Sequence, residues 1–327
     1  MARIVLGLGT SHSPQLSTPP ELWPSHGERD KRNPQLLDTD GRHVSYEELL
    51  AKADPSLAKE VAPEKWQARY EACQKGIATL GETLTRVSPD IVVIIGDDQE
   101  ELFSEDNMPA LLVYWGETIR NTPHHYAASA SPALRAAAWA YGEEEKGYPV
   151  SSELGKHLIE CLIDSGFDVA HARHLKPGQG MGHAFSFVHR RIMDDRMIPT
   201  VPIMVNTYYP PNQPTPKRCY ELGRAVRKAI DAWDSQARVA VIASGGLSHF
   251  VIDEELDQHI IKALQANDAE AVFAMPRRRL NSGTSEVRNW FVTAGAVEHL
   301  PMTLIDYVPC YRSPAGTGCA MAFAQWA

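Results

Sequence analysis

Residues 89–103 read PDIVVIIGDDQEELF, and this stretch decides the fold class. Five consecutive β-branched apolar residues without alternation are typical of a strand buried on both faces, as in parallel sheets covered by helices. Residues 97–101, DDQEE, follow the strand directly and are all polar. A solvated strand end accounts for one or two acids, whereas contact with a ligand or substrate accounts for the whole run.

Other segments extend this pattern into a complete fold. β-rich apolar runs predict strands at residues 4–8, 91–95, 110–114, 201–205 and 239–243. Helical spacing predicts helices at residues 66–87, 152–163, 217–233, 256–266 and 285–297. Their alternation predicts an α/β fold with a central, mostly parallel or mixed sheet flanked by helices. Residues 17–44 and 208–216 contain several prolines and are expected as long loops, which often form lids, binding walls or subunit contacts.

Length and composition limit the class of protein. A chain of 327 residues with 43% apolar residues is expected to form a single domain over residues 1–327. Its net charge is −9, and its 32 basic residues are scattered among 41 acidic ones, which disfavours nucleic-acid binding. No secretion signal or membrane-length apolar run is recognisable, so a cytoplasmic location without membrane attachment is expected. The five cysteines form no CxxC pair and are expected as buried thiols.

Four element-to-loop junctions carry residues suited to metal binding or acid–base chemistry. His12 lies in GLGTSHSP, residues 7–14, where the first strand is expected to end. His183 follows a glycine-rich segment, His249 closes SGGLSH, and Glu286 opens a predicted helix. Each has a structural alternative, because loop histidines are often satisfied by hydrogen bonds and glutamate is favoured in a first helical turn. Two histidines and one carboxylate on one face of a metal are the ligand set of non-haem iron oxygenases, but the spacing does not name the metal.

Over nearly its whole length the chain resembles the class III extradiol ring-cleavage dioxygenases, typified by protocatechuate 4,5-dioxygenase β subunit and by gallate and 3-O-methylgallate dioxygenases. The order and spacing of several motifs together carry the resemblance: GTSHSP (9–14), PDIVVIIGDD (89–98), VNTYYPP (205–211), KRCYELG (217–223), SGGLSH (244–249) and SEVRNW (285–290). Residues 17–88 are the least covered. We interpret them as a long insertion, a candidate lid or subunit contact within one catalytic domain.

The resemblance implies a role for each junction. His12 matches the first iron-ligating histidine, and Glu286 matches the ligating glutamate. His249 matches the acid–base histidine near bound oxygen. His183 matches a further active-site histidine that contacts the substrate.

The chain departs from the family pattern at the second histidine ligand, where an ungapped alignment puts Gln99. An amide oxygen is a weaker donor than imidazole, so a His12, Gln99 and Glu286 site is expected to hold Fe(II) less tightly than a two-histidine site. Asp98 or Glu100, after a one-residue shift, is an alternative ligand. A histidine of the extra segment, His43 or His26, is another. A further alternative is that this position no longer ligates.

The resemblance implies a dioxygenase that opens a catechol-type ring, with a small aromatic diol and O₂ as substrates. Fe(II) is the expected metal and Mn(II) the second choice. A homo-oligomer is expected, and a small α-type partner subunit remains open. The alternative function is a non-oxidative metal-binding or scaffold member of the same fold, for which the Gln99 departure is the main argument.

Overall fold

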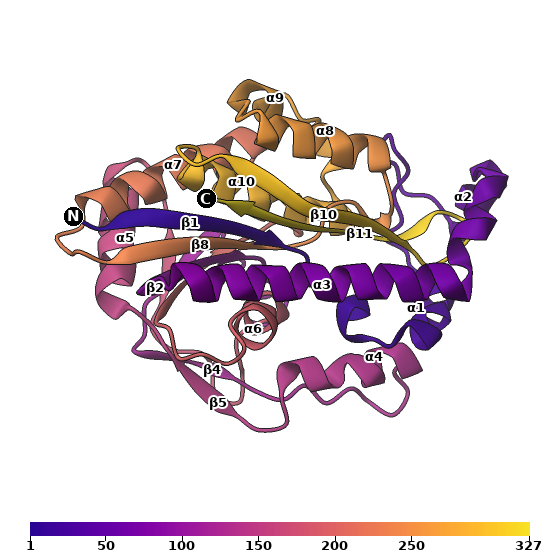
Figure 1. Ribbon diagram of the computed structural model, residues 1–327, viewed down its shortest axis with the longest axis horizontal. Helices are drawn as coiled ribbons and strands as arrows, with labels where there is room; N and C mark the ends of the chain where they lie inside the picture. Colours follow the sequence, from indigo (N-terminus) through magenta and orange to yellow (C-terminus); the bar gives the residue numbers. More distant parts are fainter.

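The computed structural model describes residues 1–327 and is built on one large mixed sheet (Figure 1). The strands run in the order β10-β11-β1-β8-β2-β7-β3-β6, and β9 pairs with β11. Their bounds are β1 (Arg3–Thr10), β2 (Ile91–Gly96), β3 (Leu111–Tyr114), β6 (Ala170–Ala172), β7 (Thr200–Val205), β8 (Arg238–Ser244), β9 (His249–Val251), β10 (Met302–Tyr311) and β11 (Thr317–Trp326). β4 (Thr118–Asn121) and β5 (Lys146–Pro149) form a separate hairpin.

The centre of the sheet is parallel and its flanks are largely antiparallel. β1, β8, β2 and β7 are parallel neighbours, whereas β11 runs antiparallel to β1 and β3 antiparallel to β7. All six residues of β2 are buried, as its unbroken apolar sequence predicts. The α/β class with a mixed sheet is therefore confirmed. Because parallel strands end at the same edge, the segments after β1, β2 and β8 meet there.

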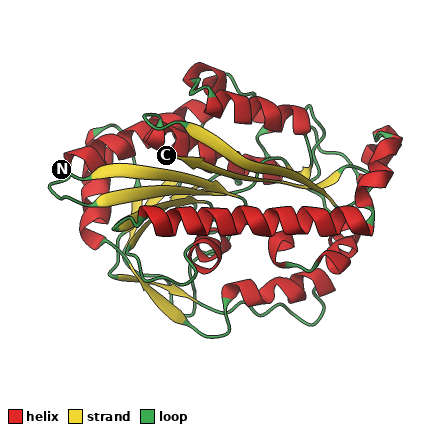
Figure 2. Ribbon diagram, in the orientation of Figure 1, coloured by secondary structure: helices red, strands yellow, loops and turns green.

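Helices cover both faces of the sheet (Figure 2). α5 (Ser152–Asp164), α7 (Pro216–Ala232), α8 (Glu254–Gln265) and α10 (Val287–Val297) contribute to a core of 45 buried residues on one face. α3 (Pro63–Val87) and α6 (His183–Phe187) contribute to a core of 30 on the other. The remaining helices are α1 (Trp23–Asp30), α2 (Tyr46–Lys52), α4 (Pro132–Ala137) and α9 (Ala269–Phe273). Short 3-10 or π turns are η1 (Pro14–Ser17), η2 (Pro20–Leu22), η3 (Pro55–Val61), η4 (Ala138–Tyr141), η5 (Val188–Ile192), η6 (Arg277–Arg279) and η7 (Ser282–Glu286).

All five predicted strands and five predicted helices are present, but two parts of the fold differ from expectation. The segment 17–44 is only partly a loop, because its residues 20–30 form η2 and α1. The two longest strands, β10 and β11, were not predicted. β10 contains Pro309, which lowers strand propensity and is tolerated because β10 is an edge strand. β11 contains three alanines and only one β-branched residue, Thr317, so its sequence has little of the composition typical of strands.

Two expectations drawn from composition can be compared with the structure. None of the helices combines the length and the apolar composition that crossing a bilayer requires. Four of the five free cysteines are buried and Cys161 is half-buried.

The buried histidine of η5 predicts a pH dependence of stability. The His189 ring is fully buried, has no hydrogen-bond partner at either nitrogen and lies 4.2 Å from the Tyr148 ring centroid. Burial lowers the pKa of His189 to about 3, although the charge of Asp195 opposes this shift. Below pH 6.5 this residue binds a proton in the unfolded chain but not in the folded chain. The free energy of unfolding therefore falls as the pH falls toward 3.

We expect this histidine to cost the wild-type protein about 2 kcal/mol of unfolding free energy between pH 7.5 and pH 5. His189→Phe keeps a planar ring but has no group that takes up a proton. The free energy of unfolding of this variant is therefore expected to fall less over the same pH range, by that amount. Urea unfolding at the two pH values measures the difference. Equal pH dependence in wild type and variant contradicts the prediction.

Candidate metal centre

The functional side chains converge where the parallel strands end. His12 follows β1, Asp97 and Gln99 follow β2, and Glu286 is the last residue of η7, directly before α10. His183 is the first residue of α6. Ligand atoms of His12, Asp97, His183 and Glu286 all lie within 4.8 Å of one another, and we call these four residues the quartet. His249, the first residue of β9, borders the quartet.

His12 presents one defined nitrogen to the quartet. Its Nδ1 lies 3.0 Å from Ser244 Oγ, whose own hydroxyl donates to the Ala184 carbonyl at 2.7 Å. Ser244 Oγ must therefore accept from His12, which puts the proton on Nδ1 and the lone pair on Nε2. Nε2 lies 3.1 Å from Glu286 Oε2 and 3.2 Å from His183 Nε2. This is the tautomer and the orientation that a metal-ligating histidine requires.

His183 is oriented by Glu101. The two oxygens of that carboxylate accept from the His183 backbone amide at 3.0 and 3.1 Å, and Oε2 also lies 2.6 Å from the ring Nδ1. Burial opposes protonation, but the charge and hydrogen bond of Glu101 outweigh it and raise the pKa of His183 to about 10. The other nitrogen, Nε2, therefore faces His12 and the cavity.

Glu286 is the most heavily bonded member of the quartet. Its Oε2 accepts from the Gly246 amide at 2.8 Å, and its Oε1 accepts from Gln99 Nε2 at 2.9 Å. His249 Nε2 lies 3.1 Å from the same Oε1. Burial opposes ionisation, but the charge of His249 and the neighbouring His12 ring hold the pKa of Glu286 well below its usual range. Glu286 is therefore a carboxylate.

Asp97 is fully buried and only half satisfied. Its Oδ1 accepts from Asn289 Nδ2 at 3.0 Å, while its Oδ2 has no hydrogen-bond partner. Burial, followed by repulsion from Glu286, raises the pKa of Asp97 to about 6. Two carboxylates and two imidazoles in one small volume, three of these residues buried, fit a divalent cation that would neutralise the acids.

His249 has its own fixed orientation. Its Nδ1 lies 2.8 Å from the Leu247 carbonyl, which can only accept, so Nδ1 carries a proton and Nε2 faces Glu286. Glycines make room for the ring, because a Cβ on Gly246 would lie 3.0 Å from it and one on Gly283 only 2.3 Å. Burial opposes protonation, but the charge of Glu286 outweighs it and raises the pKa of His249 well above its usual value.

The structure separates the residues that sequence analysis considered for the second-ligand position. Gln99 contacts Glu286 and lines the same cavity. Asp98 instead accepts from the backbone amides of Leu102 and Phe103, both at 3.0 Å, so it caps the turn after β2. Glu100 is exposed and lies outside the cavity lining.

The two histidines of the extra segment are also separated. His43 is exposed and lines a different cavity, so it is not brought to the quartet. His26 lines the cavity beside the quartet, but its Nε2 lies 3.1 Å from Thr18 Oγ1, and it is not among the quartet.

Sequence analysis missed Asp97 and Glu101 as site residues. The alternation of side chains along β2 could have identified Asp97. Val93 and Ile95 face the α10 side of the sheet, and Asp97, two residues further on, faces the same side and contacts Asn289. No local signal identifies Glu101, whose partner His183 is 82 positions away in the chain.

The quartet lies at one side of a cavity of about 330 Å³ that is lined by 18 residues. Aromatic side chains of Tyr126, Tyr141 and Phe250 form part of its wall. Arg29 and Arg312 also line it, so the cavity has basic side chains in addition to the acidic ones of the metal centre. It is large enough for a single substituted aromatic ring.

Comparison with known proteins agrees with this geometry. Residues 54–317 match the family model described as the catalytic LigB subunit of aromatic ring-opening dioxygenase. A 2,3-dihydroxyphenylpropionate/2,3-dihydroxicinnamic acid 1,2-dioxygenase of Photorhabdus laumondii is 31% identical over 173 residues, 52% of this chain and 46% of the relative. A gallate dioxygenase of Pseudomonas putida is 34% identical over 103 residues, 31% of this chain and 29% of the relative.

A further relative, from Comamonas testosteroni, carries the same name as the Photorhabdus protein and is 28% identical over 178 residues, 54% of this chain and 49% of the relative. The chain thus spans about half the length, or less, of these curated relatives. The family model, in contrast, covers most of the chain, including the segments that supply Asp97, His183, His249 and Glu286. The chain therefore belongs to the LigB family of aromatic ring-opening dioxygenase catalytic subunits.

Proposed function

We propose that the protein is a non-haem, metal-dependent extradiol dioxygenase, which inserts O₂ into a catechol-type aromatic ring and opens it beside the paired hydroxyls. The observation that carries this proposal is the buried quartet at the side of a ring-sized cavity. Fe(II) is the metal we expect and Mn(II) the second choice, because imidazole and carboxylate ligands suit both.

The residues that would hold the metal are His12 and Glu286, with Asp97 completing the set. Asp97 enters this proposal because it is a fully buried carboxylate whose Oδ1 lies 4.0 Å from His12 Nε2. Gln99 is the competing third ligand, since its Nε2 is bonded to Glu286 and its Oε1 makes no hydrogen bond in the chain. When bound, the metal would act as a Lewis acid toward the paired hydroxyls and provide the redox path between the ring and O₂.

The protein's own side chains would manage protons and position. His249, protonated beside the charge of Glu286, would donate its Nε2 proton as oxygen bonds rearrange and then take one back from a substrate hydroxyl, while the Leu247 carbonyl keeps the ring in place. His183, locked by Glu101, would hold a substrate hydroxyl with its Nε2. Both residues act from fixed rotamers, which lowers the ordering cost of the reactive arrangement.

The basic side of the cavity favours a substrate with a carboxylate. Arg312 is bonded to Gln15 Oε1 at 2.7 Å and lies 3.5 Å from Asp30, whereas the Arg29 side chain makes no ion pair or hydrogen bond. Burial, and then the charges of Arg312 and Arg29, lower the pKa of His26 well below its usual value. His26 is therefore neutral, and the positive charge on this side of the cavity comes from the two arginines. The names of the gallate and dihydroxyphenylpropionate relatives also denote carboxylated aromatic hydroxyl compounds. We propose a carboxylated catechol, with Arg29 as its carboxylate partner.

Anaerobic reconstitution followed by exposure to air tests the function. The protein is loaded with Fe(II) or Mn(II), mixed with protocatechuate, gallate, 3-O-methylgallate or plain catechol, and then given O₂. We expect oxygen uptake that matches the amount of ring-fission product, with carboxylated substrates preferred. Silence across the panel together with tight zinc binding supports the alternative, a non-oxidative metal-binding or scaffold member of the fold.

Arg29→Gln is expected to raise KM for a carboxylated substrate by about 10-fold, because the variant loses one charge-assisted hydrogen bond to the substrate. KM for plain catechol is expected to stay the same, because catechol has no group for Arg29 to bind. Arg32→Gln, an exposed arginine of the same segment outside the cavity, is the matched control. An equal rise in KM for both substrates contradicts this role of Arg29.

The two candidate third ligands can be told apart by metal affinity. Asp97→Asn removes the charge of a buried, half-satisfied carboxylate with almost no change of volume, and we expect it to weaken metal binding by at least about 10-fold. Gln99→Ala is expected to have a smaller effect, because Glu286 keeps its bonds to Gly246 and His249. Isothermal titration with Mn(II) measures both. A larger loss in the Gln99 variant assigns the third ligand to Gln99 instead.

The assembly remains a proposal from the family resemblance. We propose a homo-oligomer, and light scattering on the purified chain measures its mass. Recovery of activity only after addition of a second polypeptide would indicate a small α-type subunit.

A further inference from the structure

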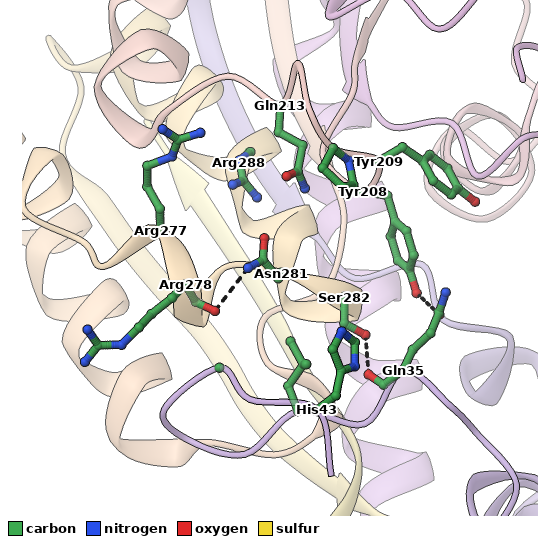
Figure 3. A pocket seen from close by; sticks show the side chains of 13 residues that line it. Gln35, His43, Tyr208, Tyr209, Gln213, Arg277, Arg278, Asn281, Ser282 and Arg288 are labelled. Atoms are coloured by element: carbon green, nitrogen blue, oxygen red, sulfur yellow. Dashed lines mark hydrogen bonds between the residues drawn. The ribbon is translucent and has the colours of Figure 1, made fainter. Parts of the chain in front are cut away.

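A second cavity is lined in part by the start of η7 and shares no lining residue with the catalytic cavity (Figure 3). It has a volume of about 500 Å³ and is lined by 13 residues. They come from the extra segment around Gln35 and His43, the proline-rich loop around Tyr208, η6 with its arginines, η7, and the start of α10. The quartet does not reach this space.

The lining of this second cavity is basic. It includes Arg277, Arg278, Arg288 and His43, and no acidic residue. The chain as a whole has nine more acidic than basic residues, so this concentration of positive charge is not a consequence of composition. Arg277 and Arg278 are exposed and make no ion pair. Figure 3 shows the Arg278 side chain directed away from the other lining side chains, while Arg277 extends toward the Arg288 side of the cavity.

Arg288 is the strongest single feature. It is 1% exposed, and its Nε and Nη1 donate to the carbonyl oxygens of Pro214, Thr207, Leu280 and Ser285. No carboxylate pairs with it, and its Nη2 makes no hydrogen bond although the residue lines the cavity. A buried guanidinium is ordinarily paired with an acid, because an uncompensated buried charge is costly. An anion in the cavity would supply the missing partner.

Several neutral polar groups of the lining are already bonded within the chain. Tyr208 donates its hydroxyl to Gln35 Oε1 at 2.5 Å, Ser282 donates to the Gln35 carbonyl at 2.7 Å, and Gln213 donates to the Thr207 carbonyl at 2.6 Å. His43 makes no hydrogen bond, and its ring lies among these side chains in Figure 3. The donors left for a ligand are therefore those of Arg277, Arg288 and His43, together with Gln35 Nε2.

We propose that this second cavity is a binding site for a small organic carboxylate with a planar, unsaturated body, distinct from the catalytic site. The arginine forks match the two oxygens of a carboxylate. The ring of Tyr208, which Figure 3 shows beside Gln35, provides apolar surface that a planar body packs against and that inorganic phosphate does not need.

The site is mechanically connected to the metal centre through η7. Ser282, at its start, lines the second cavity, and Glu286, at its end, belongs to the quartet. Between them Thr284 Oγ1 accepts from the His249 amide at 3.2 Å and donates to the His249 carbonyl at 3.0 Å. A carboxylate that orders η7 would therefore also order Glu286 and His249, and by linkage the metal would tighten carboxylate binding in return.

The test uses the full-length, metal-free protein, so that it does not depend on the proposed dioxygenase activity. All measurements are made on Arg29→Gln protein, in which the carboxylate partner proposed for the catalytic cavity is absent. Isothermal titration is carried out with benzoate, with cis,cis-muconate, with inorganic phosphate and with benzamide, a neutral analogue of benzoate. We expect one saturable site for a carboxylate with Kd below about 1 mM, and no binding of benzamide.

Arg277→Glu and Arg278→Glu are the matched pair of variants, because they make the same change of charge at neighbouring exposed positions. Arg277→Glu is expected to weaken carboxylate binding by about 10-fold or more, while Arg278→Glu changes it by less than about 3-fold. Circular dichroism checks that both variants are folded. Equal losses in the two variants, no saturable carboxylate binding, or phosphate bound as tightly as the carboxylates each overturn the proposal.

Discussion

Glu286→Ala is expected to leave the protein unable to hold its metal and without ring-opening activity. Glu286 bonds to the Gly246 amide and to Gln99, and it lies 3.1 Å from both His12 and His249, so its loss removes the negative charge around which the site is organised. Loss of an outer-sphere partner alone costs about 10- to 100-fold in metal affinity, and we expect removal of this carboxylate to exceed that range.

The measurement is the metal content of the reconstituted and dialysed variant, together with oxygen uptake. Glu286→Gln keeps the side-chain volume and an acceptor for Gly246, and it is expected to lose metal as well, which separates loss of charge from loss of packing. Glu100→Gln is the control, because this exposed glutamate follows the same strand and was an alternative ligand by sequence. Normal metal content in both Glu286 variants would remove this residue from the ligand set.

His249→Ala is expected to keep the metal and lose turnover by about 10²- to 10⁴-fold, the usual contribution of a positioned general acid–base group. The quartet does not include His249, and Glu286 retains its bonds to Gly246 and Gln99 without it. The space left between Gly246 and Gly283 is open to a small molecule of the shape of the lost ring.

Added imidazole is therefore expected to restore part of the turnover of His249→Ala, with no effect on the wild type. Oxygen uptake at matched metal content measures both effects. His124→Ala, which alters another histidine of the cavity lining, is the control and should retain most of the activity. If His249→Ala loses metal in parallel with turnover, the residue is part of the metal site rather than a proton-transfer group.

The sequence determined the fold class and the positions at which chemistry could occur. Buried strands such as β2 are visible in the sequence, because a strand covered on both faces requires an unbroken apolar run. His12, His183, His249 and Glu286 stand at element ends, where α/β proteins build their sites, and all four line the same cavity. These inferences depend on local pattern, which the chain carries residue by residue.

Only the tertiary structure decided which acid faces the metal centre and which cations face a second cavity. Asp97, Asp98 and Glu100 belong to one short run of polar residues, but one lies buried beside His12 and Glu286, one caps a turn, and one is in solvent. Likewise, Arg288 is one of many arginines until the fold buries it beside an acid-free cavity. The physical reason is that burial and charge pairing depend on contacts between segments far apart in the chain. The number of residues between two segments does not tell whether they lie close together in space.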